Sequence, residues 1–242
     1  MAARIDLGKV ALGAFLIPWW NRRAFARALA VPLLALAALM LSWYYAKAYV
    51  PTWAGWVLYV VYWALFGLFA VTTHRLVLLD PAAVAARSVP RWSKRETRFF
   101  LRLVAVGVVF AAVTWATLAV LINAWAAFHE SLDPETFELM GFAARVPAIY
   151  SFGRFCLVFP ATAVDRETGL KWAWRLSQGN GWRLFILVGV LPWIFSYALG
   201  LLYREDPTVP ETIVLTVVGI ALFVVEIAAI SLSYRELTRD EA

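Results

Sequence analysis

The sequence predicts an all-α polytopic membrane protein, with six transmembrane helices in three hairpins and amphipathic interfacial helices on the cytoplasmic side. Of the 242 residues, 63% are hydrophobic and only 16% are charged, whereas a soluble domain is nearer half apolar and a quarter charged. The mean hydropathy is +0.72. Thirteen tryptophans agree with this class, because tryptophan favours the membrane–water interface.

The first element, residues 5–20, is predicted to be an interfacial segment rather than a signal peptide. Its apolar run is followed by Arg22, Arg23 and Arg27, which a signal peptide should not carry ahead of its cleavage site. We expect Pro18 to end the segment, with the two tryptophans that follow at the level of the lipid headgroups.

Six apolar runs have the length of about 20 residues that a membrane-spanning helix needs. The fourth departs most from the pattern, because it contains Arg154 and two prolines. The predicted spans are residues 28–46, 53–73, 103–124, 146–164, 184–203 and 212–233.

The basic residues between the spans predict the orientation. Eighteen lysines and arginines lie on the side of the chain termini and three, Lys47, Arg145 and Arg204, on the other. By the positive-inside rule, both termini are expected to be cytoplasmic. Acidic residues are concentrated in the two opposite loops: Glu130, Asp133, Glu135, Glu138, Glu205, Asp206 and Glu211.

A threefold repeat of helical hairpins is predicted over residues 5–81, 82–160 and 161–235 of a single domain, 1–242. "RLVLLDP" from Arg75 and "RFCLVFP" from Arg154 share the pattern R-x-x-L-x-x-P after an even-numbered span, and Arg235 ends the sixth span. Self-similarity at a regular spacing indicates a repeated architecture. The alternative is that any bundle of hairpins alternates basic and apolar stretches in this way.

The segment after Pro160 is predicted to form a short amphipathic helix at the membrane surface, capped by Asp165 or Thr168 and ended by Gly179-Asn180-Gly181. Two basic side chains four residues apart share a helical face, which suits anionic lipid. The alternative is a simple cytoplasmic linker. The predicted lipid-headgroup residues are Arg75, Lys171, Trp174, Arg175 and Trp182.

The stretch "RFCLVFPATAV" followed by "LKWAWRLSQGNGWRLF" resembles YciC-like bacterial inner-membrane proteins and the membrane domain of some glycerophosphodiester phosphodiesterases. The resemblance covers about thirty residues and departs from the pattern at Asp165-Arg166-Glu167. It implies a six-span inner-membrane protein without catalytic residues, because the phosphodiesterase chemistry lies in a separate soluble domain.

No catalytic or cofactor motif is present, and we expect neither an enzyme nor a cofactor. His74, His129 and Cys156 are the only histidines and the only cysteine, too few for a dedicated metal site. His74 beside Arg75 could bind phosphate, although such a histidine more often simply ends a helix. Nucleic acid is not expected as a partner, because the basic residues lie between apolar runs instead of on a soluble face.

Glu226 and Arg154 are predicted to form an intramembrane polar pair. Glu226 precedes Tyr234 by eight residues, which places it about 12 Å inside its span. An acid at such a depth indicates either a functional site or an ion pair that fixes helix packing. The alternatives are Arg145 as the partner, or an Arg154 that snorkels alone beside a protonated Glu226.

The expected function is that of a non-enzymatic envelope scaffold or lipid-interacting protein of the bacterial inner membrane. Its expected partners are membrane lipids, together with a protein partner or further copies of the chain. The alternative is a small-solute or ion transporter or channel that uses Glu226 and Arg154.

The topology can be tested with reporter fusions. Fusions after residue 50, near 133 and near 206 should report a periplasmic position, and those near 90, 172 and 242 a cytoplasmic one. A cytoplasmic signal at 133 would contradict the six-span topology, because the fourth span would then be unused.

Overall fold

The computed structural model describes residues 4–46, 49–87, 91–129, 131–202 and 208–239, and all regular structure within them is helical. Lys47, Glu130, Arg204, Glu205 and Asp206, which contribute to the charge asymmetry, lie outside the described residues. The helices are α1 (Leu7–Trp20), α2 (Arg22–Ala46), α3 (Thr52–Leu78), α4 (Pro81–Ala86), α5 (Lys94–Ala126), α6 (Pro134–Phe155), α7 (Val158–Ala163), α8 (Leu170–Leu176), α9 (Gly181–Phe185), the π-helical turn η1 (Ile186–Val190), α10 (Leu191–Gly200) and α11 (Val209–Leu237).

Six helical segments of the described chain are long and apolar enough to cross a membrane, which confirms the predicted all-α class with six transmembrane helices. The arrangement in three hairpins and the amphipathic interfacial helices stay predictions. The first helix, α1, is excluded from the six segments because its 14 residues extend only about 21 Å. Pro18 lies inside α1 instead of ending it. The six segments are Arg22–Trp43, Thr52–Leu78, Lys94–Ala126, Pro134–Ala163, Gly181–Gly200 and Val209–Leu237.

Local sequence accounts for where several helices begin. Ser93 and Glu96 form a capping box at α5, and Thr208 and Glu211 form another at α11, so that each pair satisfies free N–H groups. The start of α8 differs from expectation. Its N-cap is Gly169, without a side-chain hydrogen bond, and neither Asp165 nor Thr168 caps it.

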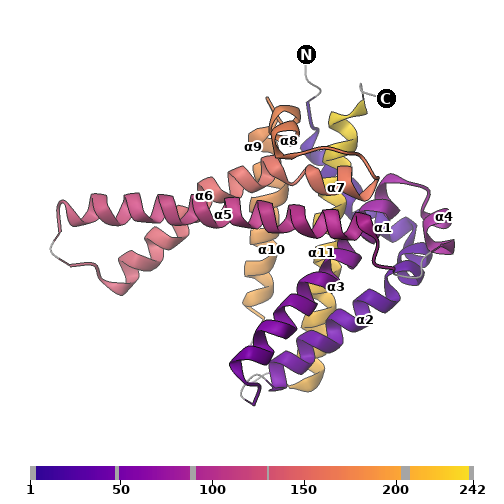
Figure 1. The fold of residues 1–242 in the computed structure, drawn as a ribbon, viewed down its shortest axis with the longest axis horizontal. Helices are drawn as coiled ribbons and strands as arrows, with labels where there is room; N and C mark the ends of the chain where they lie inside the picture. Colours follow the sequence, from indigo (N-terminus) through magenta and orange to yellow (C-terminus); the bar gives the residue numbers. More distant parts are fainter. Residues whose placement is uncertain (1–3, 47–48, 88–90, 130, 203–207, 240–242) are drawn as a thin grey trace.

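The six spans do not form one parallel bundle (Figure 1). The last helix, α11, packs against α1, α2, α3 and α10, and both chain ends lie on the same side of this group. The α5–α6 hairpin runs across the view and projects away from α10 and α11, which run down it. At 33 residues, α5 is about 50 Å long, and its principal neighbour is α6.

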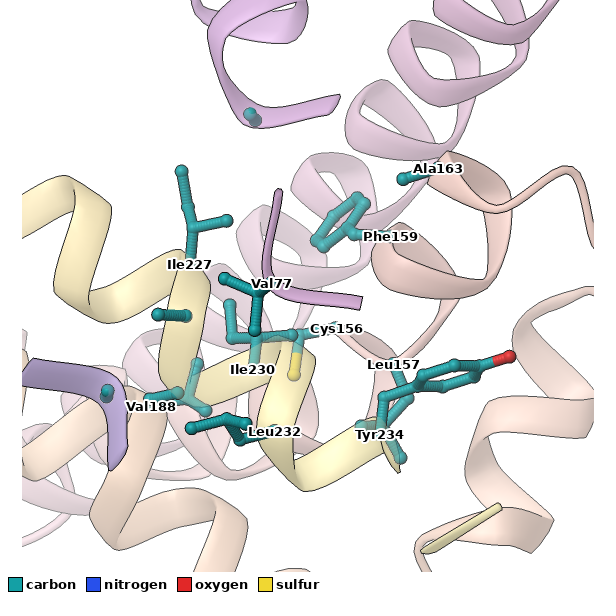
Figure 2. Packing of buried hydrophobic residues seen from close by; sticks show 14 of the residues in the cluster. Val77, Cys156, Leu157, Phe159, Ala163, Val188, Ile227, Ile230, Leu232 and Tyr234 are labelled. Carbon is teal, nitrogen blue, oxygen red and sulfur yellow. The ribbon is translucent and has the colours of Figure 1, made fainter. Parts of the chain in front are cut away.

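The buried core surrounds α7, all six residues of which are buried. Phe159 and the bend residue Cys156 belong to the same buried cluster as Val77 of α3, Val188 of η1 and Ile230 of α11 (Figure 2). The bend between α6 and α7 has a direct cause. Pro160 has no N–H group, and its ring would clash with the carbonyl of Cys156 four residues earlier in a continuous helix.

Glycines allow α6 to approach α9 and η1 closely. A Cβ on Gly153 would lie 3.2 Å from the backbone of Leu184, and a Cβ on Gly189 would overlap the Cγ2 methyl of Ile149. Small residues at such contacts let helices pack tightly where lipid offers no hydrophobic driving force.

We expect Gly189→Ala to lower stability by about 1–3 kcal/mol, because the added methyl group overpacks the contact with Ile149. The same change in an Ile149→Ala background should cost little, since the overlapping atom is gone. Thermal denaturation in detergent measures both. Gly107→Ala is the matched control, because nothing lies within 4 Å of its Cβ position. If Gly189→Ala lowered stability equally in the wild type and in the Ile149→Ala background, the contact with Ile149 would not be the cause of the loss.

Candidate functional site on the side of the chain termini

Arg154 occupies a built site at the end of α6. Its side chain is buried, its Nε donates to the Ser177 hydroxyl at 2.9 Å, and its Nη2 donates to the Trp174 carbonyl at 2.5 Å. The guanidinium carbon lies 3.7 Å from the centre of the Trp174 ring. A cation is favoured both at the carbonyl end of a helix and over an aromatic face. Arg154 therefore fastens α8 to α6, and we call these three residues the Arg154 site.

The predicted pairing of Arg154 with Glu226 is not found. In the described part of the chain, Glu226 makes no hydrogen bond or ion pair, and the hydrogen bonds of Arg154 go to Ser177 and Trp174. The physical reason is that the end of α8 supplies Arg154 with a carbonyl, a hydroxyl and a ring, so this guanidinium needs no carboxylate.

Glu226 instead faces a small apolar cavity between α11, α1 and the η1–α10 segment. The cavity measures about 20 Å³, and Phe15, Leu187, Pro192 and Phe195 are among its lining residues. That space suffices for about one water molecule. The carboxyl group is half-buried and has no cationic neighbour within 4 Å among the described residues.

A second built site is centred on Asp165, in the turn after α7. Arg95 donates from Nε to both carboxylate oxygens, at 3.0 and 3.2 Å, while Arg98 lies 3.4 Å and Arg75 3.6 Å from the carboxylate. Asp165 has φ = 62°, a left-handed conformation that aspartate tolerates better than most residues. We call these four residues the Asp165 network.

The Asp165 network is absent from the sequence-based predictions, although the sequence contains a signal for it. Arg95, Arg98 and Arg102 recur at the spacing of one helical face, and Arg102 contacts Thr162 and the Thr168 carbonyl. Asp165 and Glu167, where the chain departs from the pattern of the YciC-like proteins it resembles, supply the matching negative charge. Glu167 lies 3.4 Å from Arg98.

Two of the three arginines used to predict the repeat make a similar hydrogen bond, and the third does not. Arg75 donates to the carbonyl of Ala163 at 2.9 Å, at the end of α7, much as Arg154 donates to a carbonyl in the last turn of α8. Arg235 is exposed, and none of its contacts with described residues is a hydrogen bond or ion pair. The repeat of hairpins over residues 5–81, 82–160 and 161–235 stays a prediction.

The other predicted headgroup residues lie on α8 and at the start of α9. Lys171 and Arg175 are exposed on one face of this helix, and Trp182, at the start of α9, is 67% exposed. Trp174 is partly exposed, although its ring also packs against Arg154. We call Lys171, Trp174, Arg175 and Trp182 the α8 platform. Arg75 is not part of it, because this arginine belongs to the Asp165 network.

The histidines are placed apart. His74 is fully buried and its Nδ1 lies 2.7 Å from the Ser231 hydroxyl, so it joins α3 to α11 and is closed to a headgroup. His129 stacks on Trp125, with ring centres 3.8 Å apart. In the part of the chain that the structure describes, no three histidine, cysteine or acidic side chains gather as a metal site.

Comparison of this chain with protein-family models, curated proteins and solved structures finds no match. The resemblance to YciC-like proteins therefore stays an expectation, and the function has to be inferred from the geometry of the chain.

We expect Arg154→Met to lower stability by about 2–4 kcal/mol, because it removes hydrogen bonds made by a buried charge. Arg154→Lys should recover only part of this loss, since an ammonium lacks the planar fork that reaches two acceptors. Thermal denaturation in detergent measures both variants.

The same assay separates the Arg154 site from Glu226. The losses caused by Arg154→Met and Glu226→Gln should add to within about 0.5 kcal/mol, because the two side chains share no contact. Arg154→Met and Trp174→Leu should instead be clearly non-additive. A recovery in the Arg154→Met/Glu226→Gln double variant would show that the two residues do interact.

Proposed function

We propose that this multi-pass membrane protein is a non-enzymatic lipid-interacting scaffold, which binds anionic headgroups through the α8 platform. The described residues include six helices long and apolar enough to span a membrane. One observation carries the finer proposal: Lys171 and Arg175 are exposed on α8, and the ring of Trp182 is exposed at the start of α9, the next helix along the chain. This combination of basic and aromatic side chains suits the interface between headgroups and hydrocarbon.

The way in which α8 is held supports this proposal. Seven residues are too few for a helix that is stable in isolation, so the helix depends on its packing. Arg154 provides a fixed attachment through its bonds to Ser177 and to the Trp174 carbonyl. The exposed cations are thereby held at defined positions on the surface.

The bacterial inner membrane is the proposed location, with both termini cytoplasmic. The charge asymmetry of the sequence supports this placement, because the α8 platform and the Asp165 network both belong to the strongly basic side. The cytoplasmic leaflet presents anionic lipid, which attracts basic side chains near its surface.

A small-solute or ion transporter is the second candidate, favoured by the unpaired Glu226 within a span of the described chain and by the π-helical turn opposite it, a feature often found at functional sites. Two observations weigh against this function. The cavity beside Glu226 measures only about 20 Å³, and Arg154 belongs to a different site.

Lipid preference tests the scaffold proposal. In nanodiscs that contain phosphatidylglycerol and phosphatidylcholine, Arg175→Gln should weaken the preference for the anionic lipid about 5-fold, since one surface cation contributes about 1 kcal/mol. Native mass spectrometry of the retained lipids measures this preference. The matched control is Arg145→Gln, which removes an exposed cation of α6 and should leave the preference unchanged. Equal effects of the two changes would refute the platform as the binding surface.

A further inference from the structure

A second basic feature lies apart from the α8 platform, in a cavity where α3 ends and α5 begins. The cavity has a volume of about 320 Å³ and is partly open to the surroundings. Four arginines line it: Arg75 from α3, Arg87 from the end of α4, Arg91, and Arg95 from the first turn of α5. We call this space the arginine cavity.

Much of the hydrogen-bonding capacity of these arginines is unused. Arg87 and Arg91 are exposed and make no hydrogen bond or ion pair with any other described residue. Arg95 binds Asp165 through its Nε, which leaves both of its Nη groups without a partner in the described chain. Arg75 uses its Nη1 for Ala163 and Asp165.

The two carboxylates in the lining are already engaged by the backbone. Asp80 accepts hydrogen bonds from the N–H groups of Ala82 and Ala83 at 3.1 and 3.3 Å. Glu96 accepts one from the N–H of Ser93 at 2.8 Å and another from the Ser93 hydroxyl. Even when Asp165, which binds Arg75 and Arg95, is counted with Asp80 and Glu96, four arginines face three carboxylates, so the lining keeps a net positive charge.

The rest of the lining indicates where the ligand comes from. Leu68, Leu79 and Val84 contribute accessible apolar surface from α3, its C-cap and α4, next to the buried Ala28 and Val71, so the lining combines basic with apolar groups. A free ion would need only the basic groups. A phospholipid has both a charged headgroup and an adjoining apolar part.

We propose that the arginine cavity binds a phosphate group, with an anionic phospholipid as its source. Guanidinium groups bind phosphate oxygens through paired, charge-assisted hydrogen bonds, and Arg87, Arg91 and Arg95 retain donors for this purpose. The inference rests on the proposed function in that both use anionic lipid. The two sites lie on different elements, and each can be removed without the other.

The experiment uses the full chain in detergent, with native mass spectrometry and three probes: dioleoylphosphatidylglycerol, dioleoylphosphatidylcholine and inorganic phosphate. One molecule of phosphatidylglycerol should bind more tightly than phosphatidylcholine or inorganic phosphate does. Arg87→Gln/Arg91→Gln should weaken the binding of this phosphatidylglycerol about tenfold or more. The variant should still fold, because neither arginine makes a hydrogen bond or ion pair with another described residue. An unchanged melting temperature would show this.

Two controls separate the cavity from the platform. Arg87→Lys/Arg91→Lys keeps the charge but loses the guanidinium fork, so it should bind the lipid with intermediate affinity. Lys171→Gln/Arg175→Gln removes the same charge from the α8 platform and should leave the tight phosphatidylglycerol in place while weakening the other anionic adducts.

The outcomes distinguish the two sites and the two sources of phosphate. Wild-type affinity in Arg87→Gln/Arg91→Gln would overturn the cavity inference, and a normal lipid preference in Lys171→Gln/Arg175→Gln would overturn the platform proposal instead. Binding of inorganic phosphate that depends on Arg87 and Arg91, without tight phosphatidylglycerol, would support the phosphate site and overturn the lipid as its source.

Discussion

Burial of the Arg154 guanidinium is the constraint on which the arrangement around α8 depends. A buried cation must be given hydrogen-bond acceptors, because an unpaired charge in an apolar environment is costly. The Ser177 hydroxyl, the Trp174 carbonyl and the Trp174 ring meet this need together. Because two of these three acceptors belong to one residue of α8, satisfying Arg154 also determines where α8 lies.

In the Asp165 network the central charged group is a carboxylate, whereas in the Arg154 site it is a guanidinium. Here one carboxylate is shared by Arg75, Arg95 and Arg98, which joins the end of α3 and the start of α5 to the turn after α7. An exposed ion pair contributes little to stability, but several charges that converge on one group form a more effective network. The two sites thus hold the short helices between the spans in place.

These attachments divide the basic residues into two classes. Arg75, Arg95 and Arg154 bind acceptors within the chain and organise its backbone, whereas Lys171 and Arg175 face outward. The proposed lipid contacts depend on this division. The arginine cavity contains arginines of both classes. Arg75 and Arg95 already bind acceptors within the chain, whereas Arg87 and Arg91 make no hydrogen bond or ion pair with another described residue.

The projection of the α5–α6 hairpin has a similar physical basis. Its first turns are fastened by the Asp165 network and by packing of Phe99 against Phe159, but beyond this region α5 has α6 as its main neighbour. Side chains such as Val108 and Trp115 are correspondingly exposed. In lipid, exposure of such apolar groups carries little cost, because hydrocarbon chains are as apolar as the interior of the protein.

The sequence by itself determined the six spans, the short first helix and the end of α8 near Gly179. Each of these depends on residues close together in the chain: the length of an apolar run or a positive-φ glycine. Exposure of Lys171 and Arg175 on one face of α8 followed from their helical spacing alone.

Only the tertiary structure decided which partners the charged residues take. The expected pairing of Arg154 with Glu226 relied on similar depth along two spans, but depth says nothing about which faces of the helices meet. The hydroxyl and carbonyl that bind Arg154 belong to residues about twenty positions later, and the carboxylate that gathers Arg95 and Arg98 lies about seventy positions away. A carbonyl is available at every residue, so no sequence pattern distinguishes the one that will accept a guanidinium. That choice is made by how α6, α7 and α8 pack.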